Sequence, residues 1–290
     1  MMRSASRLAA ERVRARKRPA IEREGSVDGL LSLATELYSV ADILVDNPRL
    51  RRALGDPATP AEGRAKLIGD LVGGQVSASA REIAEAIVSE RWSSPWDMTD
   101  ALETAGDDAL FEAAERDQVL DRVVDELFRF ERILDSQSEL TVLLDEKPVE
   151  PSRRAELLHT VLGGKAHEIT CSLLEHAVRS QRKHTLTLAI DDLLEEAAAR
   201  QAQSMARVIS AVELTREQTT TLTQTLSEIY GRPITVRTAV APAIRGGLVI
   251  RIGDEVIDGS VAARLAAAEL ALGAHTSRQP IESRTRQGRH

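Results

Sequence analysis

Two glycines, Gly246 and Gly247, stand directly before a short apolar run and are the closest approach in this chain to a phosphate-binding loop. A loop of the Walker type also needs a Lys and a Ser or Thr that open a helix, and these are absent here. Glycine also permits a bulge or a close backbone approach beside a strand. We therefore interpret these two residues, with Gly253 and Gly259, as turn formers and predict no catalytic or cofactor-binding residue among them.

A metal site would need a different set of residues. Asp254, Glu255 and Asp258 are close in sequence, but a hairpin tip and opposite strand faces would separate their carboxylates. The histidines show neither an HExxH motif nor a paired Cys/His spacing, so we predict no metal ligand among them. His159 and His176 are expected on helices, at a surface or an interface. The full set of histidines is His159, His167, His176, His184, His275 and His290.

The remaining chemically distinctive side chains are one thiol and two indoles. Cys171 lies in an apolar helical stretch, where a small buried or half-buried side chain is as expected as a nucleophile, and no base can be assigned to it. Trp92 and Trp96 flank a loop and would either anchor a partner or cover the end of a helical bundle. We thus predict no catalytic residue, no cofactor and no metal.

Composition favours a helical protein. The chain has 290 residues, of which 42% are hydrophobic, 29% charged and only 2% aromatic, so its cores must be built from Leu, Val, Ile and Ala. Few aromatics argue against a base-stacking surface for single-stranded nucleic acid. The single cysteine excludes an internal disulfide framework and fits a reducing compartment. No stretch reaches the roughly 18 apolar residues of a membrane span.

Charge is unevenly distributed along the chain. Residues 1–25 carry eight basic and three acidic side chains, and residues 274–290 carry four arginines and one glutamate. The overall net charge is −7, so the middle is strongly acidic, which argues against non-specific DNA binding. The basic ends could contact acidic partner surfaces or anionic lipid, but we interpret them as solvated tails. The Arg- and Ser-containing start is also compatible with a mitochondrial transit peptide, although Glu11 weakens that alternative.

The sequence repeats itself after 90 residues without a gap. The matches lie on helix faces and at helix ends, where packing decides residue type, and a shared double glycine strengthens them. The aligned positions include Leu37 with Leu127, Leu44 with Leu134, Leu54 with Leu144, Arg64 with Arg154, and Gly73-Gly74 with Gly163-Gly164. We predict two copies of one helical bundle, a first at residues 1–105 and a second at residues 106–205.

Within the bundles, apolar residues recur at spacings of three and four, as on one face of a helix. A first charged helix over residues 4–18 is expected to end before Pro19. The clearest seam, in the second bundle, consists of Leu120, Val123, Leu127, Phe130 and Leu134.

From Arg207 onward the pattern changes to alternation, which is typical of strands. Residues 208–212, 234–240, 248–252 and 255–257 are strand candidates. Thr215 and Gln218 form a capping box for a helix that runs to Tyr230, and Ser260 is a good N-cap for a last helix to Leu272. The predicted fold is mainly α: two tandem helical bundles, a four-strand, two-helix α+β domain at 206–273, and a basic, disordered tail at 274–290.

The C-terminal motifs resemble those of a known family. The run RVISAVELT at 207–215, Gln218, the double glycine 246–247, the run GDEVIDGS at 253–260 and Arg264-Leu265 resemble the ATP synthase delta subunit, whose mitochondrial counterpart is the oligomycin-sensitivity-conferring protein. The resemblance extends back to about Asp107. The extra first bundle is similar to the long delta subunits of actinobacteria. The family usually has Asp where this chain has Ala241, before Pro242, so the turn or partner contact that this Asp would support is not expected here.

This resemblance implies a stator subunit of the F-type, proton-translocating ATP synthase that performs no catalysis itself. Its helical domain would grip N-terminal segments of the alpha subunits, and its C-terminal domain would engage the membrane-anchored b stalk. The implied location is the cytoplasmic face of the bacterial plasma membrane, with the matrix side of the mitochondrial inner membrane as the alternative. An unrelated helical scaffold that binds a regulatory partner is the alternative function. Neither nucleic acid nor a membrane span is expected.

Overall fold

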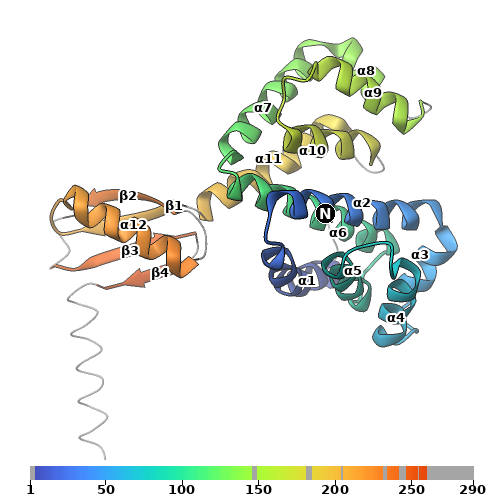
Figure 1. Cartoon of the computed structure of the whole chain (residues 1–290), viewed down its shortest axis with the longest axis horizontal. Helices are drawn as coiled ribbons and strands as arrows, with labels where there is room; N and C mark the ends of the chain where they lie inside the picture. The colour runs from blue at the N-terminus through green and yellow to red at the C-terminus, as the bar shows by residue number, and fades with distance from the viewer. Residues whose placement is uncertain are drawn as a thin grey trace, which may run out of the picture. The chain divides into compact units, whose positions relative to one another are not determined.

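The computed structural model describes residues 4–145, 149–180, 185–203, 205–230, 234–241, 246–253 and 255–259. It divides the chain into two compact units, Met1–Ala197 and Ala198–His290, which are considered separately below. The first unit is built from helices and the second contains a small sheet (Figure 1). This agrees with the predicted fold class of helical bundles followed by an α+β domain.

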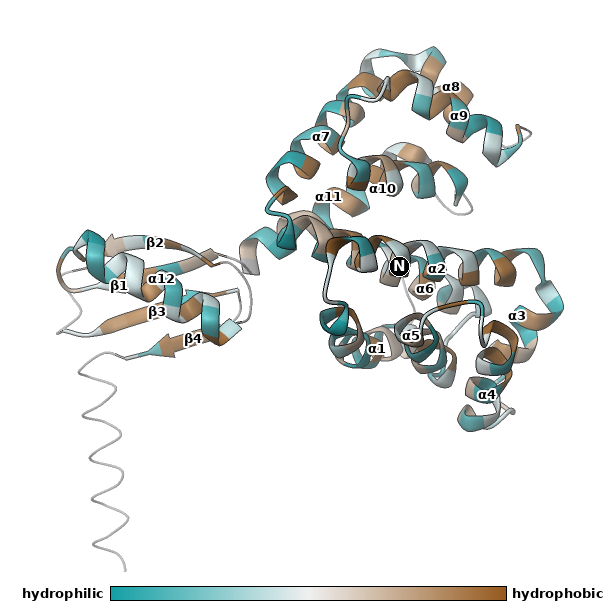
Figure 2. Cartoon of the chain, in the orientation of Figure 1, coloured by the Kyte–Doolittle hydropathy of each residue, from teal (hydrophilic) through white to brown (hydrophobic). Residues whose placement is uncertain are grey.

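The helices of the first unit mostly carry apolar residues along one side (Figure 2). Their bounds are α1 Ser4–Arg23, α2 Val27–Asp46, α3 Pro48–Gly55, α4 Ala61–Val72, α5 Ala78–Ser89, α6 Pro95–Arg116, α7 Leu120–Ser136, α8 Ser138–Asp145, α9 Pro151–Leu162, α10 Glu168–Arg179 and α11 Leu186–Gln203, whose last turns belong to the second unit.

Helix bounds follow the 90-residue repeat. Shifting α3, α4 and α5 by 90 residues gives the bounds of α8, α9 and α10. The same shift places α1 on α6 and α6 on α11, so α6 is both the last helix of the first copy and the first helix of the second. We call α1 to α6 the first copy and α6 to α11 the second copy. The proposed division at residue 105 lies inside α6, and it remains a proposal about the repeat.

The shared helix α6 is buried on more than one side. Its buried residues include Met98, Leu102, Ala105, Leu110 and Phe111, which spread around much of the helix. An amphipathic surface helix buries only one stripe, so this wide burial is what a helix between two copies requires. The first unit therefore has one continuous core that runs through both copies.

Helix α1 continues through Pro19, so the predicted end before this residue is wrong. Proline removes one backbone hydrogen bond inside a helix and ordinarily breaks or kinks it. Here the turn after Pro19 is retained because Ala20 and Ile21 are buried in the core. In addition, Lys17 forms an ion pair with Asp108 of α6, which ties this part of α1 to the bundle. The interpretation of the basic start of the chain as a solvated tail is therefore wrong for α1, because α1 packs into the core.

The second unit is a four-stranded sheet with the order β2-β1-β3-β4 and helix α12, Arg216–Tyr230. The strands are β1 Met205–Ser210, β2 Thr235–Val240, β3 Leu248–Ile252 and β4 Glu255–Asp258. β1 and β2 are parallel and connected through α12, whereas β1–β3 and β3–β4 are antiparallel. One small core joins the sheet to α12, and its buried residues are Ala206, Val208, Leu226, Ile234, Ile250 and Ile252.

Two local hydrogen-bonding features define the ends of elements in this unit. The Thr215 hydroxyl accepts from the Gln218 backbone N–H at 3.2 Å, and the Gln218 side chain accepts from the Thr215 N–H at 2.9 Å, which confirms the capping box. The Ala241 N–H donates to the Ser210 carbonyl at 2.9 Å and prolongs the β1–β2 pairing. The predicted last helix from Ser260 to Leu272 and the tail at 274–290 lie outside the described residues.

Candidate interaction sites

A buried arginine holds helix ends together in each copy. Arg64 of α4 is 3% exposed and donates to the carbonyls of Glu90 and Ser89 at 2.9 Å and of Leu54 at 3.4 Å. These carbonyls lie at the C-terminal ends of α3 and α5, which have no later turn to bond to. At the matching position Arg154 is also buried and donates to the Leu144 carbonyl at 3.2 Å. Both arginines are therefore structural side chains and not anion-binding groups facing solvent.

A glutamate provides a second repeated tie. In the first copy, Glu36 of α2 accepts from the backbone N–H of Ser77 at 2.9 Å and from its hydroxyl at 2.6 Å. In the second copy, Glu126 of α7 accepts from the His167 N–H at 2.8 Å and the Thr170 hydroxyl at 2.6 Å. Each carboxylate accepts a hydrogen bond from a backbone N–H at the start of a helix, α5 for Glu36 and α10 for Glu126. Backbone N–H groups at this end of a helix have no partner within the helix.

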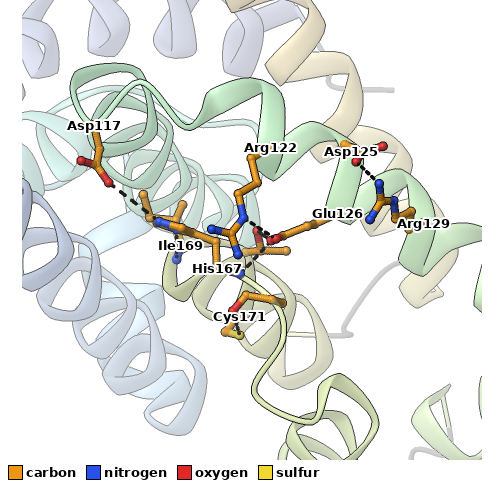
Figure 3. Close-up of polar contacts among 10 residues, drawn as sticks. Asp117, Arg122, Asp125, Glu126, Arg129, His167, Ile169 and Cys171 are labelled. Atoms are coloured by element: carbon orange, nitrogen blue, oxygen red, sulfur yellow. Dashed lines mark hydrogen bonds and ion pairs between the residues drawn. The ribbon is translucent and has the colours of Figure 1, made fainter.

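Figure 3 shows the second of these ties in detail. Arg122 donates to Glu126 at 2.8 Å, one turn along α7. Burial raises the pKa of Glu126, but the hydrogen bonds from Thr170, His167 and Arg122 outweigh it and leave the pKa below its ordinary value. The carboxylate is thus a firmly ionised structural group at neutral pH.

The two copies meet through a partly buried polar cluster. The ring of Tyr38, on α2, stacks on the ring of His176, on α10, with centroids 3.6 Å apart. The Tyr38 hydroxyl donates to Asp107 of α6 at 2.7 Å. A Cβ on Gly106 would lie 2.3 Å from the Tyr38 ring, so glycine is needed for this approach. Beside it, the Ser180 hydroxyl donates to Glu103 at 2.6 Å.

Burial raises the pKa of both Asp107 and Tyr38 in this cluster. It raises the pKa of Asp107 to about 7, further raised by Glu103 and opposed by the Tyr38 hydrogen bond and by Lys17. Burial also raises the pKa of Tyr38 well above its usual range, with Asp107 adding to the effect. Perturbed groups of this kind occur at catalytic sites, but they also occur in structural networks. Here the side chains join helices from two copies, so the cluster acts as a joint.

The histidines and the cysteine considered above lie in helices or at a helix start, where the structure describes them, and contact neighbouring residues. His159 is exposed and its Nε2 lies 3.0 Å from Glu175, whereas His176 is buried at the joint between the copies. His167 caps α10, with its Nδ1 accepting from the Ile169 N–H at 3.3 Å. Cys171 is half-buried, and burial and neighbouring carboxylates raise the pKa of its thiol, which disfavours the thiolate. His184, His275 and His290 lie outside the described residues.

Both tryptophans are used within the first copy. The Trp92 indole N–H donates to the Ile87 carbonyl at 2.8 Å. The Arg51 guanidinium lies over the Trp96 ring, 3.6 Å from its centroid. These contacts favour the interpretation in which the indoles cover the bundle end.

The glycines of the C-terminal hairpin adopt turn conformations. Gly246, Gly247 and Gly253 have φ of 105°, 85° and 56°, a region that favours glycine. Glu255 accepts from the Tyr230 hydroxyl at 2.7 Å, and Asp254 lies outside the described residues. No cluster of three potential metal ligands occurs among the residues that the structure describes. No described helix has the length and apolar character to cross a membrane.

Apolar side chains are left exposed mainly outside the first copy. In the second copy and in the sheet unit, large hydrophobic residues reach exposures from 38% to 69%. They are Phe128, Ile133, Val142, Leu143, Val161, Leu188, Val212, Ile229, Val240, Val256 and Ile257. Exposed apolar side chains mark a contact surface only where they form one continuous patch, so these positions are candidates for protein contacts and are not by themselves a site.

Taken together, repeated helices with structural polar ties and a small sheet are typical of a helical adaptor. The family model for the ATP synthase delta (OSCP) subunit matches residues 108–272. The chain therefore belongs to this family, and it is a non-catalytic peripheral-stalk subunit of the F-type ATP synthase. This excludes an unrelated scaffold.

Individual relatives extend the similarity over most of the chain. It is 41% identical to ATP synthase subunit delta of Corynebacterium urealyticum over 265 residues, 91% of this chain and 97% of that one. It is 40% identical to the subunit delta of Corynebacterium diphtheriae, over 84% of this chain and 89% of that one. ATP synthase subunit b-delta of Mycobacterium sp. (strain KMS) is 41% identical over 84% of this chain, which spans only 55% of that longer protein.

Sequence reasoning missed two of these features. The buried arginines were visible as an aligned pair, Arg64 and Arg154, but nothing in the sequence showed that they reach helix ends. The stacking of Tyr38 on His176 left no signal, because the aligned positions carry Phe128 and Ala86 and the contact joins different copies.

Proposed function

We propose that this chain joins the catalytic head of the ATP synthase to its membrane-anchored stalk. In this proposal the helical copies hold N-terminal helices of the alpha subunits, and the C-terminal domain at 206–273 holds the b subunit. The chain makes and breaks no bond. Its task is to keep the head from turning with the central shaft, which requires a rigid joint with tight contacts at both ends.

The observation that carries the proposal is the combination of a duplicated, internally tied helical unit with a separate sheet unit. The Arg64 and Glu36 ties and their counterparts fix helix ends by buried hydrogen bonds, which suits a part under load. Relatives named subunit b-delta support a link to b, because their name joins the two subunits.

Location follows from the same proposal. A chain held by the b stalk would lie at the cytoplasmic face of the bacterial plasma membrane and associate with it through the complex. The actinobacterial relatives favour this location over the mitochondrial alternative.

Calorimetry with the purified full chain tests the alpha contact. A synthetic peptide of the alpha-subunit N-terminus should bind, and a peptide of the same composition in scrambled order should not. Nanomolar affinity corresponds to about 12 kcal/mol, so even a weaker single contact would be measurable. Absence of binding at micromolar peptide would contradict this assignment. The b contact is tested separately with the soluble part of b, against a chain that ends at residue 205.

A further inference from the structure

The contact between α2 of the first copy and α10 of the second copy is made by side chains that can gain or lose a proton. Tyr38 of α2 stacks on His176 of α10, with ring centroids 3.6 Å apart and an interplanar angle of 8°. Helix α6 lies beside both rings. Its Asp107 accepts from the Tyr38 hydroxyl at 2.7 Å, and its Glu103 lies 4.0 Å from His176 Nε2.

This stack is closely packed and poorly solvated. A Cβ on Gly106 would lie 2.3 Å from the Tyr38 ring, so the ring rests against the backbone of α6. His176 and Glu103 are each only 9% exposed, and the Ser180 hydroxyl donates to Glu103 at 2.6 Å. A charge that appears in such a place loses hydration, so its cost depends on the charges already present there.

Carboxylates outnumber fixed cations among the described side chains that interact with this stack. The titratable groups of the joint come from five helices and are Lys17 (α1), Tyr38 (α2), Glu103, Asp107 and Asp108 (α6), His176 (α10) and Glu196 (α11). Lys17 forms an ion pair with Asp108, and Arg179 of α10 is paired with Glu175 at 2.8 Å. His176 is therefore the group placed to bring a further positive charge into the joint when it binds a proton.

Protons on His176 and on Asp107 act in the same direction. An imidazolium stacked on Tyr38 gains a cation–π contact and lies beside the Glu103 carboxylate. Burial raises the pKa of Asp107 to about 7, so the closed joint favours its neutral form. Loss of either proton makes the joint more negative by one charge. Lower pH thus favours the closed joint, and higher pH disfavours it.

We propose that this joint is a proton-dependent lock, which holds the two helical copies in one arrangement while His176 and Asp107 carry protons and releases them when the protons leave. In the released state α10 separates from Tyr38. The ties made by Glu126 and Arg154 keep α7 to α10 together, so these helices move as one body relative to α1 to α6.

The lock goes beyond the joining role proposed above. It makes the stiffness of the helical unit depend on the pH of the solution around it, near neutrality. It does not depend on which subunit either copy contacts.

Double electron–electron resonance on the full chain measures the distance between the copies. After Cys171→Ser removes the native thiol, spin labels are attached through Arg52→Cys on α3 and Glu156→Cys on α9, two exposed positions. We expect one narrow distance distribution at pH 6 and a broader, shifted distribution at pH 8.5. A control pair within the first copy, Glu11→Cys with Arg52→Cys, should give the same distribution at both pH values. An unchanged distance between the copies would overturn the proposal.

Variants assign the response to the two groups. His176→Phe keeps an aromatic ring on Tyr38 but binds no proton, and Asp107→Asn removes the charge at nearly constant shape. The double variant should show the narrow distribution at both pH values. The matched control is His159→Phe, because the His159 imidazole is exposed and lies 3.0 Å from Glu175. It should keep the full response. A response that survives in the double variant, or that the control also removes, would contradict the lock.

A further variant opens the joint without any change of charge. Gly106→Ala places a methyl group against the Tyr38 ring and should give the broad distribution already at pH 6. If this variant keeps the narrow distribution of the parent, the stack does not hold the copies and the proposal is wrong, even where the double variant fails to fold. Failure of the alpha-peptide calorimetry would leave all these readouts unaffected, so the two proposals fail separately.

Discussion

The two copies of the helical repeat differ most where their second and last helices meet. Between α2 and α6 the small residues Ala41 and Ala101 allow close packing, and both are buried. Between α7 and α11 the same positions hold Glu131 and Asp191. The ties made by Arg64 and Arg154 and by Glu36 and Glu126 are nevertheless kept. The repeat thus preserves what fixes helix ends and changes what decides how tightly its last helix packs.

The largest loss of stability is expected when position 41 of the first copy receives the glutamate found at the matching position of the second copy. Ala41→Glu would bury a carboxylate at a position that is 0% exposed and has no cation built for it. We expect a loss of about 4 kcal/mol in the free energy of unfolding, since an unpaired buried charge is strongly destabilising. Urea unfolding measures it. The control is Ser39→Glu on the exposed side of α2, which should change stability by less than about 0.5 kcal/mol. A similar loss of stability in both variants would contradict the close packing of α2 against α6.

Removing the buried arginine of the first copy should have the next largest effect. Arg64→Met keeps the apolar stem and deletes three hydrogen bonds to helix-end carbonyls. We expect a loss of about 3 kcal/mol, because the carbonyls stay buried without donors. Arg154→Met should destabilise in the same direction, and hydrogen exchange should localise each loss to its own copy. Exchange that rises equally in both copies would show that the ties do not act locally.

The repeat also shows which features of the fold could be predicted from the sequence alone. The 90-residue repeat, the four strands and the Thr215 capping box followed from spacing, because packing and backbone hydrogen bonds restrict residue types at such positions. Passage of α1 through Pro19 was not predictable, since it depends on burial of Ala20 and Ile21 by distant helices. The double use of α6 was missed for a related reason. The shift places α1 on α6, but α6 packs against helices of both copies and α1 against one copy only. The aligned residues therefore differ in type.

The raised pKa of Asp107, at the joint between the copies, gives a pH-dependent prediction. Asp107 has its pKa raised from 3.8 to about 7 in the folded chain, so the folded state prefers the protonated form. Its contribution to stability is fully present below pH 3.8 and is lost as pH rises through about 7. Asp107→Asn should therefore be more stable than the parent at pH 8, by about 2 kcal/mol after allowance for partial exposure. The difference should disappear near pH 4. Thermal unfolding at both pH values measures it, and a difference that is the same at pH 4 and pH 8 would contradict the raised pKa.

The smallest expected effect comes from giving the second copy the residues of the first. Glu131→Ala/Asp191→Ala removes two carboxylates that repel each other and restores the small side chains found at Ala41 and Ala101. We expect a gain of about 1 kcal/mol at pH 7, since both helix propensity and charge favour the change. The gain should shrink as pH falls, because protonation of Glu131, whose pKa is raised, already relieves the repulsion in the parent. Asp125→Ala, which breaks the exposed Arg129 pair, is the control and should change stability by about 0.5 kcal/mol or less. If the double variant instead loses stability, the carboxylates contribute to the fold of the isolated chain.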